Sequence, residues 1–216
     1  MTGASLGPAG APLRIVCLGA HCDDIEIGCG GTVMRLLAER PGSSVTWVAA
    51  SSTPTREAEA RAGAAAFLAG AAEKEIVVAA FRDGYLPFQG VEVKDFFESL
   101  KAKVRPDLIL THHRADRHQD HRLIAELTWN TFRDQAIFEY EIPKYEGDLG
   151  QPNVYFPLDE ATARRKIDLI LRSYPSQAGK RWFRAETFEA VLRLRGIECN
   201  APTGFAEAFH ATKLVM

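Results

Sequence analysis

Short apolar runs alternate with amphipathic segments along the first half of the chain. The first run, Arg14–Gly19, reads RIVCLG and ends on a glycine, which is typical of a buried strand. Apolar residues then recur at helical spacing over residues 30–39, and a Pro-Gly pair ends that helix. The same analysis predicts strands over residues 44–50, 75–80 and 107–111, and helices over residues 53–68 and 91–104. Thr53, followed by proline, is expected to be the N-cap of the helix that it begins.

The order of these elements predicts the fold class. Strands that alternate with helices favour an α/β domain with a mostly parallel sheet and helices on both faces. Beyond residue 122 the alternation is looser: we expect a helix to about residue 134, strands over 136–142, 154–157 and 205–215, and helices over 160–172 and 186–195. Residues 1–12, rich in Gly, Ala and Pro, are expected to form a flexible tail. Residues 13–216 are expected to form a single domain, since domains usually hold about 100–200 residues.

Composition excludes several classes of partner. The chain carries 26 basic and 28 acidic side chains, so its net charge of -2 offers no field that would hold nucleic acid. No stretch approaches the roughly 18–20 apolar residues of a membrane span, and the first thirteen residues lack the basic and apolar regions of a signal peptide. Four cysteines without a C-x-x-C pair favour reduced thiols. We therefore expect a cytoplasmic protein without a membrane span, and a homo-oligomer is left open.

Five of the six histidines lie in two loops, each directly after a predicted strand. The first loop, residues 20–24, reads AHCDD, and the second, residues 112–121, reads HHRADRHQDH. If the two strands are parallel neighbours in the sheet, both loops emerge at the same edge, where ligands usually bind. Imidazoles and carboxylates without clustered thiolates suit zinc or iron in a catalytic site with an open coordination position.

The residue types in these loops suit amide hydrolysis. A divalent ion held by two His and one carboxylate can lower the pKa of water to about 7 and polarise a carbonyl group. The neighbours Asp23 and Asp24 could divide the work, one binding the metal and the other taking a proton. His118 and His121 share a helix face if a helix starts near residue 118. Each residue alone has a structural alternative, as an N-cap or a turn former, but their combination favours a site.

At these residues the chain resembles the LmbE-like or PIG-L-like zinc-dependent N-acetylglucosaminyl deacetylases. The first motif, Ala20-His21-Cys22-Asp23-Asp24, stands for the family's A-H-P-D-D. The second motif is matched by His113-x-x-Asp116-x-His118-x-Asp120-His121. Weaker matches extend the resemblance over most of the chain: Gly28–Gly31, Arg56-x-x-Glu59, Asp83-Gly84 and Ala206–Phe209. The resemblance implies a Rossmann-like α/β fold.

The resemblance also implies a role for each matched residue. The metal, Zn²⁺ with Fe²⁺ as the alternative, would be held by His21, Asp24 and His121. Asp23 would be the general base, and His118 would stabilise the oxyanion or act as the acid, with Asp120 orienting it. The remaining implied contacts are with the substrate: Arg56, Asp83 and Glu207. For Arg56, an exposed arginine at a helix start is the competing interpretation.

The chain departs from the family pattern at Cys22, which replaces the usual proline. The replacement removes a φ restraint from the loop that carries both aspartates, and it puts a thiol beside the metal. The thiol could be a fourth ligand or a passive small side chain, and the passive role is favoured. Ile25 stands where many members have an acid, and the Glu26 that follows it is assigned no role.

The predicted function is hydrolysis of the acetamide of an N-acetylglucosamine-type derivative, giving acetate and a free amine. The substrate is expected to be a small aminosugar that is free, phosphorylated or part of a glycoconjugate. The basic segment 174–184 would favour a phosphate group unless it is a surface turn, and Trp182 would either stack on a sugar or pack within the protein. Two alternatives stay open: an amidase for another N-acyl conjugate, and a non-catalytic metal- or carbohydrate-binding protein. Motifs of nucleotide-binding proteins, deaminases and serine hydrolases are absent.

Overall fold

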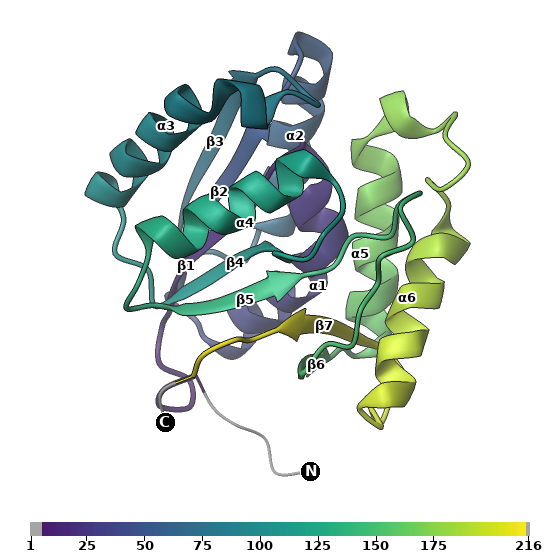
Figure 1. Cartoon of the computed structure of the whole chain (residues 1–216). Helices are drawn as coiled ribbons and strands as arrows, with labels where there is room; N and C mark the ends of the chain where they lie inside the picture. Colours follow the sequence, from purple (N-terminus) through teal and green to yellow (C-terminus); the bar gives the residue numbers. More distant parts are fainter. Residues whose placement is uncertain (1–5, 215–216) are drawn as a thin grey trace.

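The computed structural model describes residues 6–214 of the chain (Figure 1). Its strands are β1 (Arg14–Gly19), β2 (Ser44–Ser51), β3 (Glu73–Phe81), β4 (Leu108–His112), β5 (Ala136–Tyr140), β6 (Val154–Pro157) and β7 (Ala206–His210). Its α-helices are α1 (Asp24–Glu39), α2 (Pro54–Phe67), α3 (Gly90–Lys103), α4 (Gln119–Thr131), α5 (Glu160–Ser173) and α6 (Ala185–Glu198). Two short 3-10 helices are η1 (Leu86–Gln89) and η2 (Pro175–Gln177). No helix in this part of the chain is long and apolar enough to cross a membrane.

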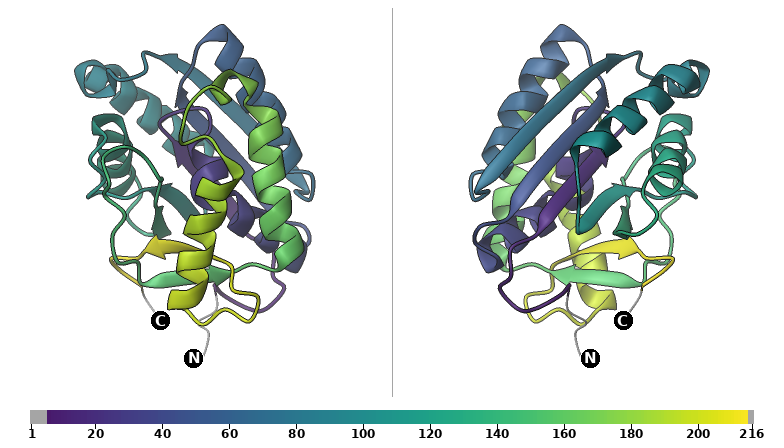
Figure 2. Two further views of the ribbon diagram at one scale, coloured as in Figure 1. Left: turned by 90° about the vertical axis from the view of Figure 1, so that its right-hand side faces the viewer. Right: turned by 90° about the vertical axis from the view of Figure 1, so that its left-hand side faces the viewer.

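The strands form one sheet in the order β3-β2-β1-β4-β5-β7-β6. The strands from β3 to β5 in this order are parallel to one another, and β7 runs antiparallel to both of its neighbours. Helices α3 and α4 cover one face of the sheet, and α1, α2 and α5 cover the other (Figure 2). The predicted α/β fold, with a mostly parallel sheet and helices on both faces, is confirmed. Because β1 and β4 are parallel neighbours, with Cys17 opposite Leu110, the loops that follow them emerge at one edge.

Two large core clusters lie on opposite faces of the sheet, and a third, smaller cluster includes residues of α5 and α6. Along β1, Val16 and Leu18 pack in the cluster formed with α3 and α4, whereas Ile15 and Cys17 pack in the cluster formed with α1 and α2. Successive side chains of a strand point to opposite faces, so a strand covered on both sides consists of apolar residues throughout. This burial holds the end of β1, and with it the loop that follows, in a rigid frame.

Helix α1 begins at Asp24, six residues before the predicted start at residue 30. Gly28 and Gly30 lie inside the helix because aromatic side chains pack directly against them. A Cβ atom at Gly28 would meet the Tyr140 ring at 2.2 Å, and one at Gly30 would meet Phe67 at 2.5 Å. These contacts require glycine at both positions, and the predicted helix start is wrong. The intrinsic cost of a helical glycine, about 1 kcal/mol, is outweighed by this packing.

Helix α2 begins as predicted. Thr53 is its N-cap, with Oγ1 accepting from the backbone N–H of Arg56 at 3.4 Å, and Pro54 occupies the first helical position. Since α2 follows the carboxyl end of β2, its first turn lies at the same edge of the sheet as the ends of β1 and β4. The fold therefore brings Arg56 toward the two histidine-rich loops.

The predicted terminal segments fall partly outside the described residues. Residues 1–5 of the expected tail and residue 215 of the expected late strand are among those not described. The late strand itself is β7, which is shorter than predicted. Within residues 6–12, the Arg40 guanidinium donates to the carbonyls of Pro8 at 3.1 Å and Ala11 at 3.0 Å, so this part is attached to the end of α1. The flexible tail and the single domain over 13–216 stay predictions.

Candidate metal centre

Two loops from neighbouring strands meet at the carboxyl edge of the sheet. Residues 20–23 join β1 to α1, and residues 113–118 join β4 to α4. Asp23 is the N-cap of α1 and His118 is the N-cap of α4. Both loops therefore end at helix starts that face the same region.

The ligand atoms predicted for one metal ion lie within 3.5 Å of one another. His21 Nδ1 is 3.1 Å from His121 Nε2 and 3.2 Å from Asp24 Oδ2, and His121 Nε2 is 3.5 Å from Asp24 Oδ2. Ligands at roughly 2.0–2.2 Å from a tetrahedral zinc ion are separated by roughly 3.3–3.6 Å. Two imidazole nitrogens and a carboxylate oxygen thus stand at spacings that suit a shared ion with an open coordination position.

The opposite nitrogen of each imidazole faces a carboxylate. His21 Nε2 is 3.1 Å from Asp83 Oδ1 and 3.3 Å from Asp120 Oδ2. His121 Nδ1 is 3.0 Å from Asp116 Oδ2, which also pairs with Lys144 at 2.8 Å. A metal-binding histidine usually donates its other N–H to such a carboxylate, which sets the tautomer and the ring orientation.

Asp116→Asn is expected to weaken zinc binding by about 10- to 100-fold, because the amide no longer holds the His121 ring as a carboxylate does. The dissociation constant is measured by competition with a chelator. Asp148→Asn is the matched control, since Asp148 pairs with the same Lys144 at 2.6 Å and contacts the Arg117 amide rather than a histidine. Equal zinc affinity in Asp116→Asn and the control would show that Asp116 does not orient His121.

His112 was not assigned a role from the sequence, yet it packs against the candidate ligands. It is buried, it ends β4, and its ring stacks on that of His121 with centroids 3.9 Å apart. Its Nε2 accepts from the Ala20 amide at 3.0 Å and lies 3.1 Å from Asp24 Oδ2. The available signal in the sequence was its position as the first residue of the histidine-rich loop, directly after a predicted strand. His112 ties the end of β4 to the loop after β1.

The imidazoles keep Asp24 ionised. Burial would raise its pKa, but the rings of His121, His21 and His112 hold the pKa of Asp24 well below its usual range. Burial and the neighbouring His112 lower the pKa of His121. The pKa of His21 is raised, because Asp24 and Asp120 outweigh the effect of burial. An ionised carboxylate and a neutral imidazole are the forms that bind a metal, so binding here would release a proton from His21.

Asp23 lies beside the ligands with its carboxylate paired. It is buried, and its Oδ1 accepts from Arg56 Nη2 at 2.8 Å. Burial raises the pKa of Asp23, and the Arg56 guanidinium opposes the rise. Arg56, expected to contact the substrate, thus contacts the candidate base, and its buried Nη1 has no hydrogen-bond partner among residues 6–214. A carboxylate with a raised pKa is suited to accept a proton.

His118 and Asp120 both reach the site, but the Asp120 carboxylate does not contact His118. It accepts from two amides of residues 84–86 at 2.7 and 3.1 Å and faces His21. Only the Asp120 backbone N–H reaches His118, donating to Nδ1 at 3.3 Å. Burial, with His121 and His21, lowers the pKa of His118. A neutral His118 whose Nδ1 accepts carries its hydrogen on Nε2, from which it can donate to an oxyanion.

Of the two acids expected to bind substrate, Asp83 lies at the site and Glu207 is engaged elsewhere. The Asp83 side chain is 73% exposed while contacting His21, which places it at the open side of the site. Glu207 is buried, accepts from two amides of α1 at 2.8 and 2.6 Å, and pairs with Lys166 at 2.5 Å. These contacts indicate that Glu207 holds α1, α5 and β7 together.

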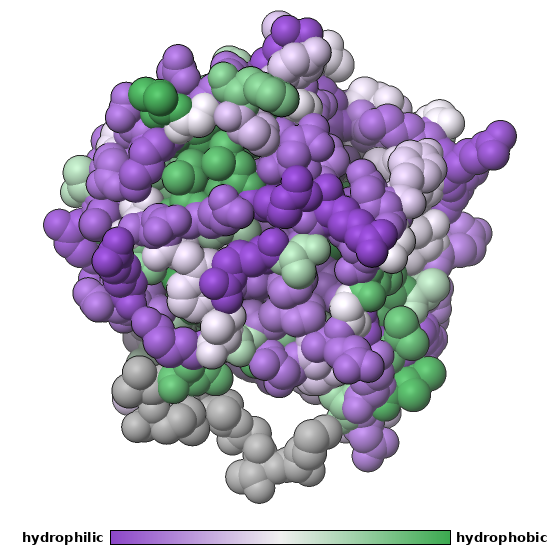
Figure 3. Space-filling view, in the orientation of Figure 1, coloured by the Kyte–Doolittle hydropathy of each residue, from purple (hydrophilic) through white to green (hydrophobic). Residues whose placement is uncertain are grey.

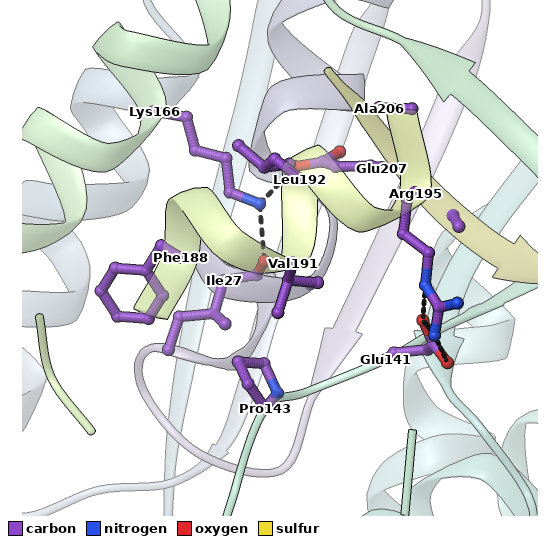
Figure 4. Close-up of a pocket in the computed structure, with 12 residues that line it drawn as sticks. Ile27, Glu141, Pro143, Lys166, Phe188, Val191, Leu192, Arg195, Ala206 and Glu207 are labelled. Atoms are coloured by element: carbon purple, nitrogen blue, oxygen red, sulfur yellow. Dashed lines mark hydrogen bonds and ion pairs between the residues drawn. The ribbon is translucent and has the colours of Figure 1, made fainter. Parts of the chain in front are cut away.

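A cavity of about 20 Å³ lies between α1, α5, α6 and β7 (Figure 4). Glu207 and Lys166 line it, together with the buried ion pair that joins Arg195 to Glu141 at 2.8 Å. Space of this size holds roughly one water molecule. Because its charges are paired with each other and it is too small for a sugar, we expect the chemistry at the open edge of the sheet.

Comparison with known proteins identifies the family. The model of the PIG-L family, described as GlcNAc-PI de-N-acetylase, matches residues 16–132. The match covers more than half of the 216 residues and includes both histidine-rich loops. The chain belongs to the PIG-L family. The predicted family is confirmed, and with it the class of enzyme that it implies, an amide hydrolase.

Solved structures with the fold of this PIG-L family member come from several organisms. The conserved protein TT1542 from Thermus thermophilus has a TM-score of 0.72 and 24% identity, covering 94% of this chain and 96% of that one. N,N'-diacetylchitobiose deacetylase from Pyrococcus horikoshii has a TM-score of 0.70 and 19% identity, covering 94% and 84%. GalB, the 4-carboxy-2-hydroxymuconate hydratase from Pseudomonas putida, has a TM-score of 0.68 and 16% identity, covering 94% and 98%. At these identities the likeness concerns the fold alone.

At Cys22, where the PIG-L pattern has proline, the thiol is engaged by β2. Its Sγ donates to the carbonyl of Ser51 at 3.3 Å. Burial raises the pKa of the Cys22 thiol to about 11, so it stays protonated at neutral pH. Because the thiolate is the form that binds a metal, the contacts support the passive role over the fourth ligand.

Glu26 is fully buried beneath the same loop of this PIG-L domain. Its Oε1 contacts the hydroxyl of Tyr174, which also donates to the carbonyl of Cys22. Burial raises the pKa of Glu26 to about 8, so the protonated form predominates at neutral pH. The sequence contained one signal for this residue, an acid directly after the first motif, but its partner Tyr174 lies far along the chain.

In the basic segment 174–184, Trp182 packs against aromatic residues of the core, while Lys180, Arg181 and Arg184 are exposed. The ring of Trp182 meets those of Phe183 and Phe188 edge-on, with centroids 5.5 and 6.4 Å apart, and Lys180 lies over it at 5.7 Å. These contacts support the packing interpretation of Trp182 over sugar stacking.

Proposed function

We propose that this PIG-L family member is a zinc-dependent hydrolase that removes the acetyl group from an N-acetylated aminosugar and releases acetate and a free amine. The observation that supports it best is the trio of ligand atoms at 3.1–3.5 Å, with Asp23 next to Asp24 in the sequence and its buried carboxylate paired with Arg56. His21, Asp24 and His121 would hold the metal. Imidazole and carboxylate ligands suit Zn²⁺, with Fe²⁺ as the alternative.

The residues around these ligands would transfer the proton and stabilise the oxyanion. When bound, the metal supplies a Lewis acid and a water of lowered pKa. Asp23 takes a proton from the attacking water, whose oxygen adds to the amide carbon. The oxyanion that forms accepts a hydrogen bond from the Nε2–H of His118. The C–N bond then breaks, and the proton on Asp23 passes to the leaving nitrogen.

The substrate is proposed to be a small N-acetylated aminosugar derivative. The family description names GlcNAc, and that of one structural neighbour names diacetylchitobiose. The exposed carboxylate of Asp83 at the open side of the site supports the proposal that Asp83 accepts hydrogen bonds from sugar hydroxyls. The absence of a nucleic-acid partner, the cytoplasmic location and a homo-oligomer stay predictions.

Acetate release from a panel of N-acetylated sugars tests the proposal. The panel contains free, phosphorylated, nucleotide-linked and lipid-linked sugars, each incubated with protein loaded with Zn²⁺ or Fe²⁺ and with metal-free protein. We expect release from at least one class, and only with metal. A protein that holds its full complement of zinc and releases no acetate from any of them would instead support the non-catalytic binding alternative.

Hydrophobic side chains lie exposed on the segment that carries Asp83 to the site. Three of them are Tyr85 at 42%, Phe88 at 81% and Val91 at 73% exposure. Figure 3 shows hydrophobic surface on this side of the molecule, near the start of α3. A 3-10 helix rises about 2 Å per residue, so Phe88 lies only about 4 Å along η1 from Leu86, whose amide holds Asp120. We propose that these exposed side chains form a contact surface for the part of the substrate beyond the sugar.

Phe88→Ser is therefore expected to lower kcat/KM about fivefold for substrates with an apolar aglycone, which corresponds to the loss of about 1 kcal/mol of apolar contact. The value for the free sugar should not change. Ile197→Ser, a similar change at a 75% exposed position on α6, is the control. An equal effect of Phe88→Ser on both substrates would contradict an aglycone contact.

A further inference from the structure

Tyr174 joins the end of α5 to the loop that carries the candidate base. It is the C-cap of α5 and is fully buried. Its hydroxyl donates to the carbonyl oxygen of Cys22, a residue 152 positions away in the sequence. The same hydroxyl contacts Glu26 in the first turn of α1. A single side chain thus reaches across the domain to the turn between β1 and α1.

A second contact leads from Tyr174 to Asp23 through Arg56. The guanidinium carbon of Arg56 lies 5.3 Å from the centroid of the Tyr174 ring, within the range of a cation–π contact. The same guanidinium donates to Asp23 Oδ1 at 2.8 Å. Tyr174 therefore contacts the peptide before Asp23 directly, through the Cys22 carbonyl, and the carboxylate of Asp23 indirectly, through Arg56.

The sequence of the loop explains why such a connection matters. Proline at position 22 would restrict φ to about −65°, whereas Cys22 has no such restraint. The bond from the Cys22 thiol to Ser51 holds the side chain, but not the peptide that follows it. A hydrogen bond to the Cys22 carbonyl restrains that peptide plane.

We infer that Tyr174 is a positioning residue. Its hydroxyl restrains the peptide between Cys22 and Asp23, and thereby aims the Asp23 carboxylate, in place of the restraint that proline supplies in the family motif. The kinetic part of this inference rests on the proposed function, whereas the restraint on the loop is a property of the protein without substrate. The position of the base matters because a displacement of about 1 Å can cost about 100-fold in rate.

Tyr174→Phe tests the inference, because it keeps the ring under Arg56 and removes only the hydroxyl. We expect kcat for acetate release to fall about 10- to 100-fold, with KM and zinc content close to the wild-type values. The amides of Asp23 and Asp24 should exchange with deuterium faster. Adding Cys22→Pro to Tyr174→Phe should recover most of kcat and slow the exchange again, since the ring of proline restores a restraint on the same turn.

Tyr155→Phe is the matched control. Tyr155 lies in the edge strand β6, where its hydroxyl donates to the Pro152 carbonyl at 3.0 Å and contacts Glu198 at 3.2 Å. The same chemical change there removes a tyrosine hydroxyl far along the sheet from the β1–α1 turn. We expect wild-type kcat and wild-type exchange at Asp23 and Asp24.

Equal kcat and equal exchange in Tyr174→Phe and wild type would overturn the inference. It would also be overturned if activity fell together with zinc content and Cys22→Pro recovered neither, because that pattern describes general support of the fold. If the wild-type protein releases no acetate, the proposed function fails, and the exchange comparison still decides whether Tyr174 restrains the loop.

Discussion

The Asp23→Asn variant is expected to keep its bound metal but to lose most of its kcat. Asparagine keeps the shape of the side chain and can still accept from Arg56, which donates to Asp23 at 2.8 Å, but it takes no proton at neutral pH. General acid–base catalysis contributes about 10²–10⁴-fold, so kcat should fall by about that factor. Acetate release at saturating substrate, with metal analysis of the same sample, measures both quantities.

Asp107→Asn is the control for this experiment. Asp107 pairs with Arg14 at 2.7 Å at the amino-terminal edge of the sheet, so it is a similar Asp–Arg pair away from the site. It should retain wild-type kcat. Near-wild-type kcat in Asp23→Asn would show that Asp23 is not the base, and loss of zinc in that variant would indicate that it is a ligand.

His121→Ala is expected to lose zinc and activity together. The change leaves His21 and Asp24 as the remaining candidate ligands, 3.2 Å apart, and a catalytic zinc site normally uses three protein ligands. Treatment of the wild-type protein with a chelator should abolish acetate release in the same way. Adding Zn²⁺ should restore the chelated wild-type protein, but not the variant.

The structure offers a matched histidine for this test. His113 and His210 stack at 3.8 Å, much as His112 and His121 stack at 3.9 Å, but at a distance from the ligand trio along the sheet. His210→Ala should therefore keep its zinc. Full zinc content in His121→Ala, or undiminished acetate release by the chelated wild-type protein, would contradict the proposed ligand set.

The surroundings of the adjacent Asp23 and Asp24 shift their pKa values in opposite directions. Burial raises the pKa of Asp23, with Arg56 opposing the rise, whereas three imidazoles hold the pKa of Asp24 well below its usual range. Pairs of titratable groups whose pKa values are pushed apart in this way are typical of acid–base sites. The same geometry supports Asp24 as a ligand and Asp23 as the base.

The fold by itself does not decide the reaction. A hydratase, GalB, shares it with a TM-score of 0.68, as a deacetylase does with a TM-score of 0.70. Both similarities are below 20% identity, where the arrangement of side chains has to be judged in each protein. Acetate measurement is decisive here because hydration releases no acetate.

The pattern of apolar and polar residues in short stretches of the sequence was sufficient to predict most of the strands and helices. Each predicted strand and helix has a counterpart, because apolar periodicity and caps such as Thr53 act within a few residues of the chain. The start of α1 was misplaced because Tyr140 and Phe67, which pack on its glycines, are distant in sequence. Contacts of this kind leave no trace in a short window of residues.

The sequence by itself determined the α/β class, the family and the two loops that carry the histidines and aspartates, whereas the structure showed that β1 and β4 are neighbours and bring these loops to one edge. Only the tertiary structure decided what each side chain contacts. The structure shows that Arg56 donates to Asp23 and that Asp120 faces His21. It also shows that Glu207 pairs with Lys166 and that Tyr174 donates to the carbonyl of Cys22. The physical reason is that residue type and periodicity act within a short stretch of chain, whereas strand neighbours, hydrogen bonds and charge pairing depend on the positions of residues far apart in the sequence, and hydrogen bonds on atomic positions to within an ångström.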